Sequence, residues 1–145
     1  MKKIIFLVLM ISSILLSGCS LFEEVNDSLN YVNETSDYIN TVTQFAEDAP
    51  QMIQDAASDS AVKEELTNEL KTIKDEIEQF NGLDAPAIAE DINQQIVNKN
   101  EVILEEINKA LTNGELALEK LKESELFQII EDVTGLMNQI ENLGL

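Results

Sequence analysis

Apolar side chains recur along this chain at every third or fourth position, the spacing that gathers them on one side of an α-helix. No stretch alternates apolar and polar residues as a half-buried strand would. The regular spacing is interrupted at a few helix-breaking signals, which are Pro50, Asn81-Gly82, Pro86 and Asn113-Gly114. The pattern predicts an all-α protein.

Four amphipathic segments lie between these signals. They are expected to begin near Val25, Pro50, Pro86 and Gly114, and Ser124 is the predicted N-cap of the last long helix. Within the second segment, the cluster Ser58-Asp59-Ser60 is a candidate cap for a fresh helix start. Each segment has one apolar side that must be buried, and an antiparallel bundle of three to four long amphipathic helices does this with few crossings. The first and last helices are then expected to be neighbours.

The expected core residues share the helical spacing. In the first segment they are Val25, Leu29, Val32, Ile39, Val42 and Ala46, with Tyr31, Tyr38 and Phe45 beside them at seven-residue intervals. In the later segments they are Val62, Leu66, Leu70, Ile73, Ile77 and Phe80; Ile88, Ile92, Ile96, Ile103, Ile107 and Leu111; and Leu126, Ile129, Ile130, Val133, Met137, Ile140 and Leu143. The three aromatic residues are expected to form an internal seam; the alternative is an exposed stripe that docks a partner helix.

The beginning of the chain has a different pattern. Met1-Lys2-Lys3 is basic, Ile4 to Leu16 is a continuous apolar run, and Ser17-Gly18 are small residues. A basic start, an apolar run of this length and a small-residue site describe a secretory signal. As a helix the run would reach only ~20 Å, which is short of the ~30 Å hydrocarbon core of a bilayer.

The tetrapeptide Leu16-Ser17-Gly18-Cys19 resembles a bacterial lipobox. In proteins with this motif the cysteine thiol receives a diacylglyceryl group, and cleavage between the glycine and the cysteine makes the cysteine the first mature residue. We therefore expect residues 1–18 to be a removed lipoprotein signal peptide, 19–24 a short lipid-anchored linker and 25–145 the helical bundle domain. Cleavage then falls between Gly18 and Cys19, and Cys19 is the lipid-attachment residue. The alternative is an uncleaved anchor that happens to end at Cys19.

Composition narrows the chemistry. The 145 residues include 28 acidic residues and nine lysines but no arginine, histidine or tryptophan, and the formal net charge is −19. Without histidine and with one cysteine, a His-based triad and His- or thiolate-ligated metal sites are excluded. The excess of acid makes nucleic-acid binding unexpected. We expect no enzymatic activity, no metal and no cofactor other than the covalent diacylglyceryl lipid on Cys19.

Catalytic pairs, calcium loops and an acidic surface are the remaining candidate sites in this sequence. Adjacent carboxylates such as Glu105-Glu106 carry no catalytic meaning among so many acids, and Ser60 with Lys63 lacks the further motifs of Ser–Lys enzymes. Calcium loops could lie at residues 55–59 or 81–84, but neither has EF-hand spacing.

After Cys19, lysines occur only between Lys63 and Lys122, so the first and last helices should present one acidic side. That side is either a solvated surface or a face for cations.

Several segments together resemble a family of uncharacterised small helical lipoproteins of bacilli. They are the lipobox, the segment from Tyr31-Val32-Asn33 to Phe45, the turn from Phe80 to Pro86, and the ending from Leu126 to Gly144. The resemblance covers nearly the whole chain and implies a membrane-anchored helical protein outside the cytoplasm. It implies no activity.

The expected function is that of a non-enzymatic lipoprotein on the extracytoplasmic face of the cell membrane, anchored to membrane lipid through Cys19. It would serve as an interaction or structural component of the cell envelope, with an envelope protein as partner. The alternative is an acidic binding module for a cation or a small cationic ligand, such as weak binding of calcium or a cationic peptide.

Overall fold

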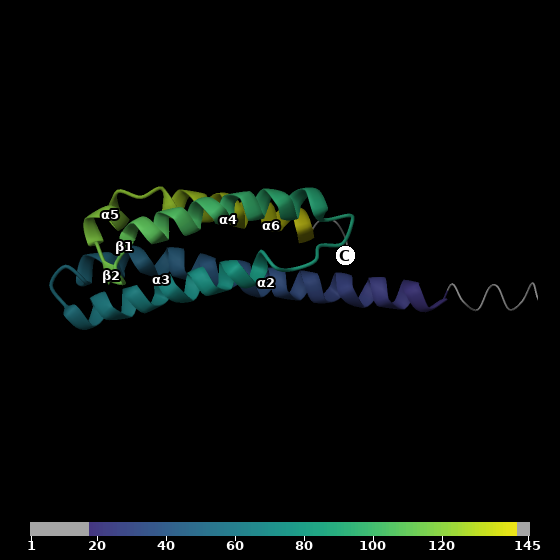
Figure 1. Cartoon of the computed structure of the whole chain (residues 1–145), viewed down its shortest axis with the longest axis horizontal. Helices are drawn as coiled ribbons and strands as arrows, with labels where there is room; N and C mark the ends of the chain where they lie inside the picture. Colours follow the sequence, from purple (N-terminus) through teal and green to yellow (C-terminus); the bar gives the residue numbers. More distant parts are fainter. Residues whose placement is uncertain (1–17, 142–145) are drawn as a thin grey trace, which may run out of the picture.

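The computed structural model describes the backbone of residues 18–141 and the side chains of residues 28–136, 139 and 140. The elements in this part of the chain are α2 (Gly18–Asp55), α3 (Ser60–Phe80), α4 (Glu90–Ala110), β1 (Leu111–Thr112), β2 (Glu115–Leu116), α5 (Leu118–Lys122) and α6 (Leu126–Glu141). The long helices α2, α3, α4 and α6 run alternately up and down (Figure 1). The predicted all-α helical bundle is confirmed.

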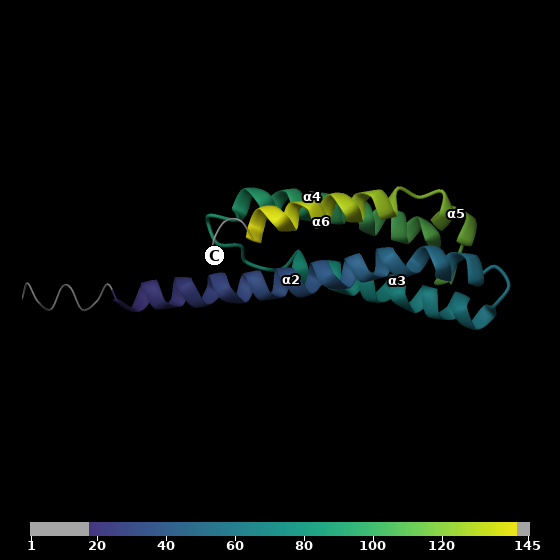
Figure 2. The same ribbon diagram turned by 180° about the vertical axis from the view of Figure 1, so that it is seen from behind.

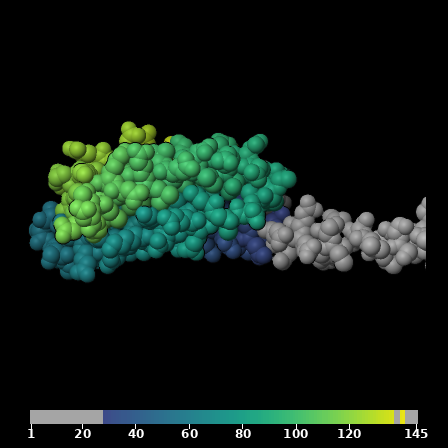
Figure 3. Space-filling model, viewed as in Figure 1, coloured from purple at the N-terminus to yellow at the C-terminus, as the bar shows by residue number. Residues whose placement is uncertain are grey.

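The four long helices form two layers, with α2 and α3 in one and α4 and α6 in the other (Figure 1). Helix α2 packs against both α3 and α6, and α4 packs against α6. The view from behind brings α2 and α6 to the front (Figure 2), whereas α3 and α4 form the opposite face (Figure 3). The first and last helices are therefore neighbours, as the sequence predicts.

The core seam of α2 follows its aromatic residues. Tyr31, Tyr38 and Phe45 are all at least 95% buried, which confirms the internal seam. The core prediction for Leu29 is wrong, because its side chain is 50% exposed. The seven-residue aromatic spacing turns a neighbouring side of the helix inward, and aromatic rings offer more apolar area to bury than leucine does.

The other helices bury residues at alternating spacings of three and four. In α3 and α4 these are Leu66, Leu70, Ile73, Ile77 and Phe80, and Ile96, Asn100, Ile103, Ile107 and Ala110. Helix α6 adds Leu126, Ile130, Val133 and Ile140. The expected stripes are confirmed there, while Met137 and Leu143 lie outside the described side chains. Ile88 is a wrong core prediction: it precedes α4 and is 57% exposed.

Two helix starts differ from the sequence prediction. Helix α2 continues through Pro50 to Asp55, so the predicted start at Pro50 is wrong. The second helix begins at Ser60 with Asp59 as its N-cap, which confirms the candidate cap in the cluster Ser58-Asp59-Ser60. Proline removes one backbone hydrogen bond, but burial of Ala49 and Ile53 on either side of it continues the core seam. The third helix begins at Glu90, after Pro86 rather than at it.

Asn113-Gly114 forms a hairpin turn instead of a simple helix stop. Both residues have positive φ, 55° and 81°, and Leu111 pairs with Leu116 in an antiparallel register. Positive φ at both central positions is the geometry of the tight type I′ hairpin, for which Asn-Gly is the favoured pair. The expectation that the chain has no strands is wrong at this one short ladder.

Ser124 is not the N-cap of the last helix. Its hydroxyl donates a 2.7 Å hydrogen bond to the Leu121 carbonyl at the end of α5. The first backbone bond into α6 joins the Ile129 N–H to the Glu125 carbonyl. The serine therefore closes the short helix that precedes it.

Replacing Gly135 with alanine should stabilise the bundle. A Cβ atom built at this position of α6 meets nothing within 4 Å, and alanine is favoured over glycine inside a helix by about 1 kcal/mol. Urea denaturation followed by circular dichroism should report that gain. Gly114→Ala is the control, because its φ of +81° makes a side chain unfavourable and should lower stability. Destabilisation by Gly135→Ala would contradict the packing described here.

Candidate functional site

Cys19 lies in the first turn of α2, which begins at Gly18. Residues 19–24, expected to be a linker, are thus helical and continuous with the bundle. From Cys19 to Tyr31, the start of the described core seam, the helix rises ~18 Å. The leader up to residue 17 lies outside the described residues, and lipid attachment at Cys19 stays a prediction. The structure links that residue to the bundle through an unbroken helix.

Within residues 18–141, no helix combines the length and the apolar character needed to cross a bilayer.

Two tyrosines of α2 reach across the bundle to asparagines of α4. The Tyr31 hydroxyl donates to Asn93 Oδ1 over 3.0 Å, and the Tyr38 hydroxyl donates to Asn100 Oδ1. Each pair is separated by 62 positions in the sequence, so α2 and α4 run parallel with a shared seven-residue repeat. The hydrogen bonds tie together two helices that lie diagonally in the bundle (Figures 1 and 2).

The Tyr38–Asn100 pair extends to the end of α3. Asn100 Nδ2 donates to Asn81 Oδ1 over 2.8 Å, and Asn81 is the C-cap of α3. The Tyr38 ring stacks on Phe80 with a centroid separation of 4.6 Å. Asn100 is fully buried, and both ends of its amide are hydrogen-bonded. A satisfied amide of this kind has a structural role, since burial without partners would be costly.

Burial controls the protonation of both tyrosines. It raises the pKa of Tyr38 far above its ordinary value of 10.0, although the hydrogen bond to Asn100 acts in the opposite direction. Burial also raises the pKa of Tyr31, with a smaller contribution from the negative charge of Glu90. Both hydroxyls therefore stay neutral donors at physiological pH.

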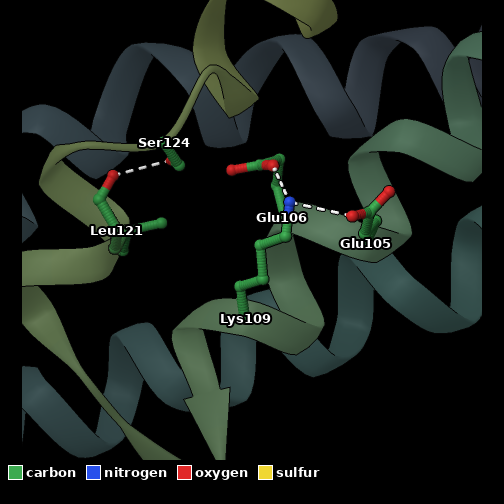
Figure 4. A network of polar contacts seen from close by, with 5 residues as sticks. All are labelled: Glu105, Glu106, Lys109, Leu121 and Ser124. Carbon is green, nitrogen blue, oxygen red and sulfur yellow. Dashed lines mark hydrogen bonds and ion pairs between the residues drawn. The ribbon is translucent and has the colours of Figure 1, made fainter.

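Charge is distributed unequally between the two faces. Helix α2 carries eight acidic residues and no lysine, and α6 also has no lysine. Within the described part, lysines lie on α3, α4 and α5. On α4, Lys109 pairs with Glu105 and Glu106 at 2.9 and 2.8 Å (Figure 4). These hydrogen bonds raise the pKa of Lys109. The expected acidic side corresponds to the face formed by α2 and α6.

A groove of about 580 Å³ lies between α2 and α6, and we call it the α2–α6 groove. Its lining residues are Thr43, Ala46, Glu47, Phe127, Ile130, Glu131, Thr134 and Gly135. Phe127 lies beside Phe45, with ring centroids 6.2 Å apart. Because Gly135 has no side chain and a Cβ there would meet nothing within 4 Å, the groove remains open along α6.

The polar groups of the groove fall into two kinds. Thr134 Oγ1 donates to the Ile130 carbonyl over 2.9 Å and lies 3.0 Å from Thr43 Oγ1, so Thr43 is the donor in the contact between the hydroxyls. Glu47 and Glu131 are exposed, and no ion pair among the described residues includes either of them. The threonines thus bridge the helices, and the carboxylates are available to a ligand.

In the first candidate calcium loop, residues 55–59, both acids have local hydrogen-bond partners. Asp59 Oδ1 accepts the Ala61 N–H at the start of α3, and both carboxylate oxygens of Asp55 accept from Gln51. In the other loop, Asn81 accepts from Asn100. Among the described residues, no group of three or more acidic or cysteine side chains is arranged to hold a metal ion.

The sequence indicated the acidic face but missed the groove. In the sequence Glu131 is one acid among 28, and Gly135 is a single glycine inside a helical pattern, so neither residue by itself indicates a site. The missed signal is the run of a threonine and a glycine, Thr134-Gly135, in an otherwise large apolar stripe. Only the pairing of α6 with α2 shows that these small residues leave a hollow.

The fold and the site define a class before any family: an all-α bundle whose first helix begins at a lipobox-like cysteine. A family model described as "Family of unknown function (DUF6376)" matches residues 31–143. The "Uncharacterized lipoprotein YybP" of Bacillus subtilis (strain 168) is 34% identical over 130 residues, covering 88% of each chain. No solved structure matches. The chain belongs to the DUF6376 family, and the resemblance to uncharacterised lipoproteins of bacilli is confirmed.

Replacing Tyr38 with phenylalanine should destabilise the protein by about 1–3 kcal/mol, because Asn100 Oδ1 would remain buried without its donor. The pKa of Tyr38 is higher in the folded state than in the unfolded state, so this tyrosine contributes stability below pH ~10 that is lost as the pH rises further. The variant should therefore also lose less stability on alkalinisation.

Urea titrations at pH 7.5 and at several values above pH 9.5 measure both effects. Tyr31→Phe is the control, and its neutral-pH cost should be smaller because the Tyr31–Asn93 pair is only partly buried. Equal costs for the two variants would show that burial does not determine the contribution of these pairs.

Mass spectrometry of the native protein should find Cys19 as the first residue, with a diacylglyceryl thioether. The variant Cys19→Ser should keep residues 1–18, because cleavage of the leader at a lipobox requires the lipid-modified thiol. Ser20→Ala, next to the cysteine, is the control and should mature normally. An intact leader with an unmodified thiol in the native chain would contradict lipid attachment.

Proposed function

We propose that the protein is a lipid-anchored interaction module on the extracytoplasmic face of the cell membrane, which binds another protein of the envelope and performs no catalysis. The observation that carries this proposal is that α2 contains both the lipobox-like Cys19 and one wall of the α2–α6 groove. A single helix thus joins the attachment point to the binding surface.

The continuous helix supports a fixed distance from the membrane. Between Cys19 and the groove residues Thr43 to Glu47, α2 rises ~36–42 Å. An anionic bilayer would repel the acidic face, which favours an upright bundle at low salt. In that orientation the groove faces the aqueous space outside the membrane, within reach of the exposed domain of a neighbouring protein.

The groove itself supports binding rather than catalysis. Its volume lies in the range of ligand pockets, and its lining combines apolar side chains with a few polar groups. The threonine hydroxyls bond to each other and to a helix carbonyl, so they are not arranged with a base that could activate them. The alternative function, an acidic module for a small cationic ligand, would use the carboxylates of Glu47 and Glu131 in this groove.

Site-specific photo-cross-linking in native membranes tests this function. A photoreactive residue at Asn40, which is exposed on α2 and one to two turns before the groove residues, should give a reproducible cross-linked envelope protein. The same residue at Thr72, exposed on α3, is the matched control and should not give that product.

A second variant tests the continuous helix. A flexible Gly-Ser insertion after Glu24 should reduce the Asn40 product several-fold, because it releases the groove from its fixed height. Absence of any product, or equal products from Asn40 and Thr72, would contradict the proposed function.

A further inference from the structure

We infer that the α2–α6 groove binds a basic amphipathic segment of a partner protein, with aliphatic side chains on the groove floor and lysine or arginine head groups beside Glu47 and Glu131. The inference rests on the proposed function and specifies the chemistry of the partner. Three features of the molecule support it: the apolar floor of the groove, the two carboxylates without an ion pair, and the negative charge of the face around them.

The floor of the groove is apolar. Ala46, Phe127 and Ile130 line it, and Gly135 adds backbone without a side chain. Ala46 and Phe127 are partly exposed and pack against the core, so an apolar group placed here would bury surface that now faces solvent. An aliphatic side chain therefore gains free energy in the groove, whereas a hydrated ion alone does not.

The two carboxylates lie on opposite walls, Glu47 on α2 and Glu131 on α6. Asp132, the next residue of α6, is paired with Lys99 of α4. Glu47 and Glu131 instead line the groove between α2 and α6, and neither of these two helices has a lysine to pair with them. A cationic group supplied by another molecule would neutralise them, and long basic side chains can cover apolar surface while their heads reach the acids.

The same charges disfavour the other occupants. Two copies of this chain joined through their α2–α6 faces would bring lysine-free acidic surfaces together, which costs free energy by like-charge repulsion. A bare metal ion lacks its ligand set, since no group of three acids among the described residues could hold one. A short polycation would meet the carboxylates but leave the apolar floor unused.

The lining of the groove spans about two turns of α6, from Phe127 to Gly135, and one turn of α2. That length suits two or three turns of a helix, which would present one or two apolar side chains at spacings of three or four. The inferred partner segment is therefore short, with a few apolar anchors and several basic residues.

The test measures peptide affinity for the full-length mature protein in phosphatidylcholine nanodiscs at 150 mM salt, an ionic strength at which distant charges are screened. The probe is a fluorescent ten-residue peptide with two leucines four positions apart and four lysines, followed by anisotropy, with empty discs as background. We expect saturable binding. A peptide with serine in place of leucine should bind more weakly, and one with glutamate in place of lysine should not bind.

Two groove variants are compared with matched controls. The double variant Glu47→Gln/Glu131→Gln should weaken binding about tenfold, the combined effect of two exposed charge pairs. Its control, Glu64→Gln/Glu78→Gln on α3, makes the same change in net charge and should leave affinity unchanged. Gly135→Met fills the groove and should also weaken binding, while Thr72→Met on α3 should not. Circular dichroism confirms that each variant is folded.

The inference would be overturned if the α3 control weakened binding as much as the groove variant does, or if the leucine peptide did not bind at all. It would also be overturned if the serine peptide, or the short polycation spermine, bound as tightly as the leucine peptide. These outcomes are separable from failure of the proposed function. A partner cross-linked at Asn40 whose contact segment is not basic would keep the function and remove the inference. Peptide binding without any membrane partner would keep the site and remove the envelope role.

Discussion

The hydrogen bond from the Tyr38 hydroxyl to Asn100 joins two diagonal helices inside the core. The Tyr31–Asn93 pair repeats it one heptad earlier, and one heptad later the equivalent positions are the buried apolar pair Phe45 and Ile107. A shift of α4 along α2 by one turn would leave buried polar groups unpaired, at about 1–3 kcal/mol each. The polar pairs therefore favour one register among those that apolar residues alone would tolerate.

Fixing that register also fixes where the charges lie. With α2 and α4 diagonal, α2 must take α3 and α6 as its neighbours (Figures 1 and 2). Lysines of α4 and α5 form ion pairs with acids near them, including Asp132 on the side of α6 that faces α4. The α2–α6 face receives none. Since its carboxylates repel one another, the contact between these helices relies on buried residues such as Val42 and Val133.

The continuity of α2 would set the distance between this face and a lipid attached at Cys19. A proline inside a helix removes a hydrogen bond and usually kinks or ends it. Around Pro50 the burial of Ala49, Ile53 and Ala56 against the bundle continues the helix to Asp55. At its other end the helix begins beside Cys19. A lipid attached there would hold the groove at the end of a continuous helix, whereas the sequence predicted a short linker at residues 19–24.

The sequence alone determined the helical class, most of the core stripes and the acidic character of the first and last helices, because these follow from residue spacing and composition. It left the number of long helices at three or four. It did not decide whether a helix continues through Pro50 or whether Ser124 begins the last helix, because local signals compete there with tertiary burial. It also did not decide that Asn113-Gly114 would form a hairpin. It also could not choose between Leu29 and Tyr31 for the core. The groove is purely tertiary: Glu47 and Gly135 lie 88 positions apart, and only the packing of α6 on α2 brings them to one surface.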